Sequence, residues 1–147
     1  MEKKTIPDLS PTDKMLILNA IEARRNAYCL YSKYAVGCAV LSESDGCYLG
    51  WNVEVVIFST TVHAEQNAIS RMPAHDRKIK TLAIACPTGG VPCGACAEFI
   101  MEFGTKETVL LGYNINNNEV TVTTLGELMH LRFKESDIRC EVLKQKP

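Results

Sequence analysis

Two short segments constrain the fold more than any other feature, because each places metal-binding side chains at the start of a predicted helix. The first segment, HAE, runs from His63 to Glu65, and the second, PCGAC, runs from Pro92 to Cys96. Imidazole and thiolate groups are ligands that Zn²⁺ prefers, and a catalytic zinc site uses three protein ligands and leaves one position for water. His63, Cys93 and Cys96 supply that number, so the two segments have to be interpreted together.

Apolar runs and turn signals divide the chain into predicted helices and strands. The predicted helices span residues 10–28, 63–72, 93–103 and 125–133, and the predicted strands span residues 34–41, 47–54, 79–86, 107–113 and 119–124. This order predicts an α/β fold of three α-β-α layers, in which helices cover both faces of a mixed five-stranded sheet. The length of 147 residues is that of one domain, which we expect to span residues 1–147.

The loop between the last two predicted strands restricts their relative direction. It comprises only residues 114–118. A loop of this length can join two antiparallel strands in a hairpin, whereas a parallel crossover needs a dozen or more residues. We therefore expect the last two strands of the sheet to be antiparallel.

The residue types of the two motifs predict how the site would work. Two thiolates and a neutral imidazole balance the charge of Zn²⁺. The bound ion lowers the pKa of a coordinated water towards about 7. Helix N-termini lower the pKa of thiols, so Cys93 and Cys96 are expected to be thiolates. Glu65 lies two positions after His63 and is expected to face away from it on the helix. It is therefore predicted to be an acid/base and not a ligand.

Each motif alone also has an ordinary explanation. A single H-x-E is typical of a solvated helix start, and a single C-x-x-C is typical of a redox pair or of half a structural zinc site. The two together, each at the start of a helix, favour a catalytic zinc site. A closed structural site would need a fourth protein ligand, and Cys86 is the nearest candidate in the sequence.

Composition argues against several other classes of protein. The net charge is −1 and the pI is about 6.3, and no basic patch is evident, so we expect no nucleic-acid partner. No apolar run approaches the roughly 20 residues that span a bilayer. Residues 1–8 are polar and unlike a signal peptide, which predicts a cytoplasmic location. The count of seven cysteines is odd, which favours free thiols and metal ligands over disulfides.

The paired motifs resemble the signature of the zinc-dependent nucleobase deaminases. Over residues 10–138, the chain resembles the small cytidine deaminases that act on free nucleosides. Residues 31–37 resemble that family's Y-S-x-F-x-V-G segment, and Asn52 to Glu54 resemble its N-x-E. The short loop at 114–118 also matches the nucleoside enzymes, because the polynucleotide and free-base enzymes insert a helix there.

The resemblance implies a zinc-dependent hydrolase that converts cytidine and deoxycytidine to uridine and deoxyuridine in pyrimidine salvage. It implies Zn²⁺ as the cofactor and Glu65 as the catalytic acid/base, and its metal ligands correspond to His63, Cys93 and Cys96. It also implies a set of contacts to a small nucleoside, in which paired side chains hold the ribose hydroxyls and other groups contact the base or close a neighbouring subunit's pocket. The residues implied for these contacts are Asn52 and Glu54 for the ribose, Tyr34 and the Ala64 amide for the base, and Phe133 for the neighbouring pocket.

Departures from the family pattern leave alternatives open. After N-x-E the family usually continues N-A-x-Y, whereas this chain has Val55 to Phe58. A deaminase of a modified cytosine nucleoside, of the blasticidin S kind, is therefore the second hypothesis. A zinc-bearing scaffold with a degenerate pocket is the third, although a scaffold has no need of Glu65. The resemblance also implies a homo-oligomer, for which a tetramer is favoured and a dimer is the alternative.

Overall fold

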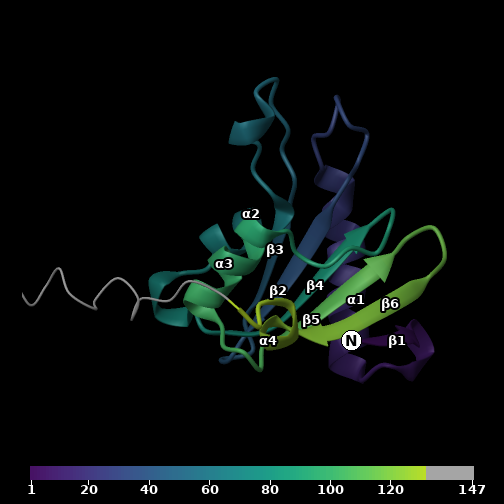
Figure 1. Ribbon diagram of the computed structural model, residues 1–147, viewed down its shortest axis with the longest axis vertical. Coiled ribbons are helices and arrows are strands. Elements are labelled where there is room, and N and C mark those ends of the chain that lie inside the picture. The colour runs from purple at the N-terminus through teal and green to yellow at the C-terminus, as the bar shows by residue number, and fades with distance from the viewer. Residues whose placement is uncertain (132–147) are drawn as a thin grey trace, which may run out of the picture.

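A six-stranded mixed sheet forms the centre of the computed structural model, which describes residues 1–131 (Figure 1). The strands follow the order β1-β6-β5-β4-β2-β3. Strands β4 and β5 are parallel, and every other neighbouring pair is antiparallel. The predicted mixed sheet and the predicted final antiparallel pair are therefore confirmed. The strands are β1 (Glu2–Thr5), β2 (Gly37–Ser42), β3 (Cys47–Trp51), β4 (Ile79–Cys86), β5 (Val109–Asn114) and β6 (Glu119–Thr124).

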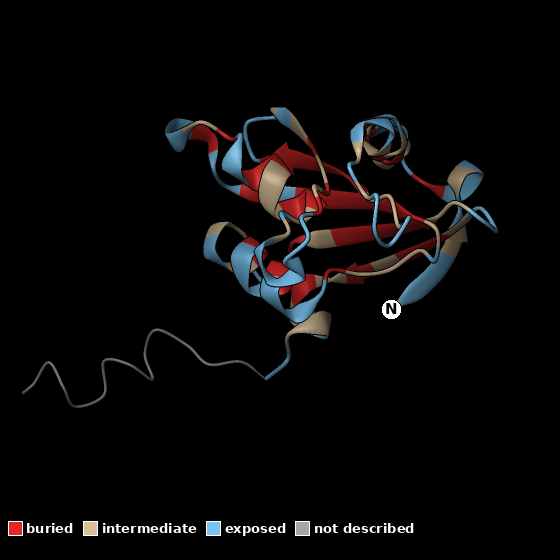
Figure 2. Ribbon diagram, turned by 90° about the horizontal axis from the view of Figure 1, so that it is seen from above, coloured by how far each residue is buried: buried red, intermediate tan, exposed pale blue. Residues whose placement is uncertain are grey.

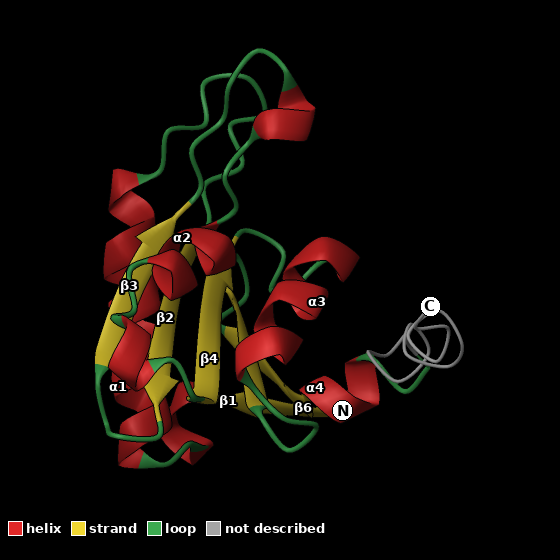
Figure 3. Cartoon of the chain, turned by 90° about the vertical axis from the view of Figure 1, so that its left-hand side faces the viewer, coloured by secondary structure: helices red, strands yellow, loops and turns green. Residues whose placement is uncertain are grey.

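Helices cover both faces of the sheet, as predicted (Figure 3). One face packs against α1, and the opposite face packs against α2, α3 and α4. No helix among residues 1–131 combines the length and the apolar character needed to cross a membrane. The helices are α1 (Pro11–Ala23), α2 (Ala64–Ser70), α3 (Gly94–Phe103) and α4 (Leu125–Leu128), and α1 continues into a 3₁₀ turn at Arg24–Asn26.

The position of strand β2 between two cores explains why its sequence is apolar without alternation. Cys38 and Val40 point into the core beneath α2 and α3, whereas Ala39 and Leu41 point into the core beneath α1. All four side chains are buried. A strand that is covered on both faces needs apolar residues at consecutive positions, and the burial of the central strands is visible in Figure 2.

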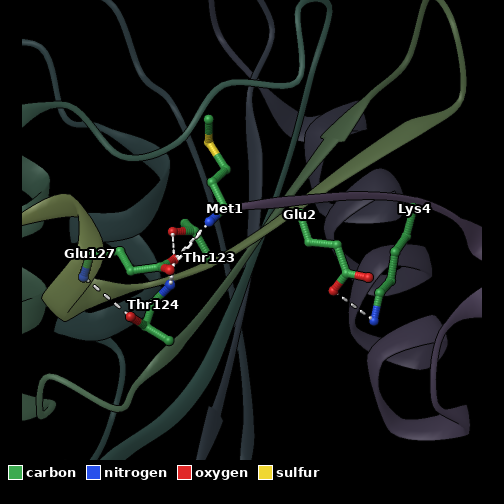
Figure 4. Close-up of polar contacts among 6 residues, drawn as sticks. All are labelled: Met1, Glu2, Lys4, Thr123, Thr124 and Glu127. Atoms are coloured by element: carbon green, nitrogen blue, oxygen red, sulfur yellow. Dashed lines mark hydrogen bonds and ion pairs between the residues drawn. The ribbon is translucent and has the colours of Figure 1, made fainter.

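The sixth strand, β1, differs from the five-strand prediction. It consists of polar residues that pair antiparallel with β6, and the Lys3 ammonium group contacts the side chains of Glu119 and Thr121. The terminal ammonium of Met1 lies 3.2 Å from the Glu127 carboxylate (Figure 4). Backbone pairing and charge hold this edge strand in place. An apolar pattern could not reveal it, because β1 contains no apolar residue.

Helix α2 lies against strand β3 at a glycine. A Cβ atom at Gly50 would lie 2.4 Å from the Ala64 carbonyl oxygen and 2.3 Å from the Ala68 nitrogen, so only glycine allows this approach. One side chain of α2 and one from the residue that follows it then cover the outer edge of β3. Asn67 Nδ2 donates to the Trp51 carbonyl at 2.9 Å, and an Arg71 guanidinium nitrogen donates to the Leu49 carbonyl at 3.0 Å. These contacts set the position of α2 and protect the edge strand from pairing with another chain.

We expect Gly50→Ala to destabilise the protein by about 2 kcal/mol or more, because α2 must move away from β3 to accommodate the methyl group. Gly94→Ala is the matched control, since a Cβ there meets nothing within 4 Å. Thermal unfolding of both metal-free variants compares them. Equal loss of stability in the two variants would contradict this account of the α2–β3 contact.

Candidate active site

The three predicted metal ligands converge where helices α2 and α3 begin. His63 immediately precedes α2, Cys93 immediately precedes α3, and Cys96 lies in the first turn of α3. His63 Nδ1 lies 3.5 Å from Cys93 Sγ and 3.3 Å from Cys96 Sγ. A tetrahedral zinc ion, with its usual bond lengths, separates its nitrogen and sulfur ligands by roughly 3.5 Å, close to both of these distances. The spacing of the three ligand atoms therefore fits zinc.

The rest of the described chain adds no fourth protein ligand to this group. Among residues 1–131, His63, Cys93 and Cys96 form the one cluster of at least three potential ligands, and their ligand atoms lie within 4.8 Å of one another. Cys86, the alternative considered above, lies outside it, and its sulfur accepts a hydrogen bond from the Gly90 amide at 3.1 Å. A set of three protein ligands is typical of a catalytic zinc site, not of a structural one.

In the absence of metal, the surroundings of Cys96 disfavour its charged form. Burial raises the pKa of the Cys96 thiol far above its usual value, and the nearby Glu65 carboxylate and Cys93 sulfur raise it further. The helix N-terminus therefore does not by itself hold Cys96 as a thiolate. A cation has to supply the charge that displaces the thiol proton, and metal binding at such a site releases protons. The donor set thus fits a divalent metal better than a redox pair.

Glu65 is a buried carboxylate in the first turn of α2, with only 6% of its surface exposed. Burial raises the pKa of Glu65, because an apolar environment disfavours the charged form. Glu65 and His63 line the same cavity. His63 is in an extended conformation before the helix, so helical spacing does not relate the two residues.

A cavity of about 490 Å³ opens beside the cluster. Its walls come from the two loops that project beyond the sheet, residues 27–36 and 52–63, and from the loop between β4 and α3 (Figures 1 and 3). None of the described residues that line it is lysine or arginine. The volume is that of a typical small-molecule site. Seven of the predicted residues line it: Tyr34, Asn52, Glu54, Ala64, Glu65 and the ligands His63 and Cys93.

The predicted residues Asn52 and Glu54 lie side by side at the end of β3 and are both buried. Asn52 Oδ1 accepts from the Val36 amide at 2.9 Å, and Asn52 Nδ2 donates to the Tyr34 carbonyl at 2.9 Å. Glu54 accepts hydrogen bonds from the loop at Tyr31 and Ser32. Both side chains therefore line the cavity and hold the neighbouring loop at the same time.

Tyr34 also lines the cavity. Its hydroxyl group is hydrogen-bonded to Thr88 Oγ1 at 2.5 Å, and this contact joins the 27–36 loop to the β4–α3 loop. Partial burial raises the pKa of the Tyr34 hydroxyl. The sequence analysis assigned no role to Thr88, Ser32 or the cavity-lining Phe58, although Ser32 lies within the segment of residues 31–37 that resembles a family motif. Phe133 lies outside the described residues.

Comparison with known proteins identifies the family. The family model for the cytidine and deoxycytidylate deaminase zinc-binding region matches residues 10–112. A protein of Sporosarcina psychrophila named cytidine deaminase is 34% identical over 84% of this chain and 92% of its own length. A crystal structure of cytidine deaminase from Burkholderia pseudomallei is 30% identical, with a TM-score of 0.75 over 85% of this chain and all of that one.

A second solved structure gives the same result. The crystal structure of cytidine deaminase from Mycobacterium tuberculosis is 27% identical, with a TM-score of 0.71 over 85% of this chain and 99% of that one. The matched region contains every member of the His63, Cys93 and Cys96 cluster, so the cofactor of this protein is Zn²⁺. The chain therefore belongs to the cytidine and deoxycytidylate deaminase family.

Proposed function

We propose that the protein hydrolyses cytidine and deoxycytidine to uridine and deoxyuridine, with release of ammonia, in pyrimidine salvage. The observation that carries this proposal is that the buried Glu65 and two members of the ligand cluster, His63 and Cys93, line one cavity. Relatives similar over most of the chain are named cytidine deaminases. The cavity is of a size for a nucleoside.

In this proposal Glu65 moves the protons of the reaction. Zn²⁺, held by His63, Cys93 and Cys96, supplies Lewis-acid activation of a water molecule. The Glu65 carboxylate accepts a proton from the attacking water, donates it to N3 of the cytosine ring, and then assists proton transfer to the amine that leaves from C4. Burial of Glu65 supports this role, because a raised pKa favours the protonated form that the carboxyl must adopt between the two transfers.

The remaining residues of the cavity position the substrate. We assign the base contacts to the Tyr34 ring and the Ala64 amide, and the sugar hydroxyls to Asn52 and Glu54, all of which line the cavity. Phe133 is assigned to the pocket of a neighbouring subunit on the basis of resemblance alone.

The charges of the cavity favour a nucleoside over a nucleotide. Its described lining includes the carboxylates Glu54 and Glu65 but no lysine or arginine that could bind a phosphate. A 5′-phosphate would therefore lose its hydration without gaining a cationic partner.

A second candidate is supported by Phe58. This side chain lines the same cavity as Asn52 and Glu54, in the Val55 to Phe58 segment that departs from the family pattern. An enlarged or modified sugar, as in blasticidin S, could contact such an apolar group. Competition between cytidine and blasticidin S in an absorbance assay decides between the two substrates.

We also propose that the protein is a homo-oligomer, with a tetramer favoured over a dimer. Apolar side chains at the tip of the 52–63 loop support this proposal. Val56, Ile57 and Phe58 are 74%, 61% and 58% exposed, which is unusual for adjacent apolar residues. The cytoplasmic location expected from the sequence stays a prediction.

Glu65→Gln is expected to lower kcat by about 10²–10⁴-fold, because the amide cannot accept and return the proton. Zinc content should stay near one ion per chain. Loss of cytidine absorbance and a metal count measure the two quantities. The matched control is Glu102→Gln, an exposed residue on α3. Turnover within tenfold of the wild type, with zinc retained, would refute the role assigned to Glu65.

Cys93→Ser is expected to weaken zinc binding by more than about 100-fold, because loss of a residue that only orients a ligand already costs 10–100-fold. Cys86→Ser is the matched control and should retain zinc, since the serine hydroxyl can also accept from the Gly90 amide. Titration with a chromophoric chelator gives both affinities. Weakened binding in both variants would mean that the assigned ligand set is incomplete.

Ile57→Glu should shift the protein to smaller species, because a charge would be buried in the proposed subunit contact. Leu18→Glu is the matched control: Leu18 is 57% exposed on α1, away from the projecting loops. Size-exclusion chromatography with light scattering gives the masses. A monomeric wild-type protein would contradict the proposed assembly.

A further inference from the structure

The turn formed by residues 29–34 wraps around the Glu54 carboxylate. Lys33 has a φ of 59°, in the left-handed region, and its amide donates to the Cys29 carbonyl at 3.0 Å. The turn directs two successive backbone amides to one oxygen, so that Glu54 Oε2 accepts from Tyr31 N at 3.1 Å and from Ser32 N at 3.2 Å. Successive amides arranged in this way form a concave site for an anion.

The Ser32 hydroxyl connects this carboxylate to the base side of the cavity. Ser32 Oγ donates to Glu54 Oε1 and also accepts a hydrogen bond from the Tyr34 amide at 2.9 Å. One hydroxyl group therefore joins the residue assigned to the sugar and the residue assigned to the base. Among residues 1–131, Ser32 is the one side chain with hydrogen bonds to both.

The environment of Glu54 shows why these donors are needed. The residue is 5% exposed, and a buried carboxylate is costly unless hydrogen bonds replace its water. The Ser32 hydroxyl, aided by the Ser32 and Tyr31 amides, holds the pKa of Glu54 below its usual value. Glu54 therefore stays ionised and acts only as an acceptor.

The two oxygens of Glu54 are not equivalent. Oε2 accepts from two amides, whereas Oε1 accepts from Ser32 Oγ as its one donor in the described part of the chain. A carboxylate oxygen accepts two hydrogen bonds readily. The remaining acceptor position on Oε1 is thus the one that a ligand hydroxyl could occupy.

We propose that Ser32 is a positioning residue for substrate recognition: its hydroxyl orients Glu54 so that Oε1 accepts a hydroxyl group of the substrate's sugar. The inference rests on the proposed function, and Ser32 touches no reacting atom. Ser32 acts through the hydrogen bond between its own hydroxyl and Glu54, so its effect should depend on whether the substrate has sugar hydroxyls.

The test compares cytidine with 2′,3′-dideoxycytidine, which lacks the 2′- and 3′-hydroxyls of the sugar and keeps the 5′-hydroxyl. Ser32→Ala is expected to raise KM for cytidine about tenfold or more, as for loss of a hydrogen bond to a charged group, with a smaller change in kcat. The ratio of kcat/KM for cytidine to that for dideoxycytidine should fall by a similar factor. Ser32→Thr, which keeps the hydroxyl, should restore the ratio.

The controls separate this role from a structural one. Ser59→Ala alters an exposed serine of the other projecting loop and should leave the ratio unchanged. Melting temperature and zinc content are measured for each variant. If Ser32→Ala does not fold, Ser32→Cys is tested in its place. The cysteine side chain is similar in volume to serine, but its thiol is a weak hydrogen-bond donor.

Each outcome bears on a different claim. Equal losses of kcat/KM on the two substrates, or no loss on either, would overturn the inference about Ser32 and leave the proposed function intact. Failure of Ser32→Thr to restore the ratio would also contradict the role assigned to the Ser32 hydroxyl. No turnover of cytidine by the zinc-loaded wild type would instead refute the proposed function, and the inference with it.

Discussion

The meeting of the α2 and α3 N-termini is the constraint on which the rest of the structure depends. Three ligand atoms from two separate chain segments can lie within 4.8 Å only if both helices begin at the same end of the sheet. Gly50 allows α2 to approach β3, and the buried small residues Ala68 and Ala97 belong to the shared core beneath the helices. Close packing of the helices beneath the ligands therefore sets the geometry at the ligands.

The surroundings of Glu54 and Glu65, which line one cavity, give the two carboxyl groups different functions. Glu65 is buried in the core beside Cys96, and burial raises its pKa, whereas three donors from the 29–34 turn lower the pKa of Glu54. The first environment suits a group that exchanges protons, and the second suits a permanent acceptor. Sequence spacing could not assign these environments, because each depends on residues distant along the chain.

The sequence predicted the metal ligands and the layers of the fold, but it did not predict all of the residues that form the cavity walls. The ligand cluster and the three layers follow from motifs and apolar runs, whose physical causes are local. Strand β1 was missed because backbone pairing and the Lys3–Glu119 contact hold it, and Ser32 was missed because its role depends on Glu54. These misses share one cause, which is that long-range contacts decided the outcome.

The division between rigid elements and loops explains why the class of reaction was easier to infer than the substrate. The ligands and Glu65 lie at the starts of helices that are packed against the sheet, but most groups that could recognise a sugar lie on the two projecting loops. A bridge between Val53 and Val62 closes the base of one loop, and the rings of Tyr31 and Phe58 meet edge to face at 5.8 Å to join the two. The Tyr31 amide also donates a hydrogen bond to Glu54. A substitution at Phe58 can therefore alter the position of Glu54 in the sugar site without altering the metal ligands. Departures from the family pattern in this loop should therefore alter which nucleoside binds while leaving the deamination chemistry intact.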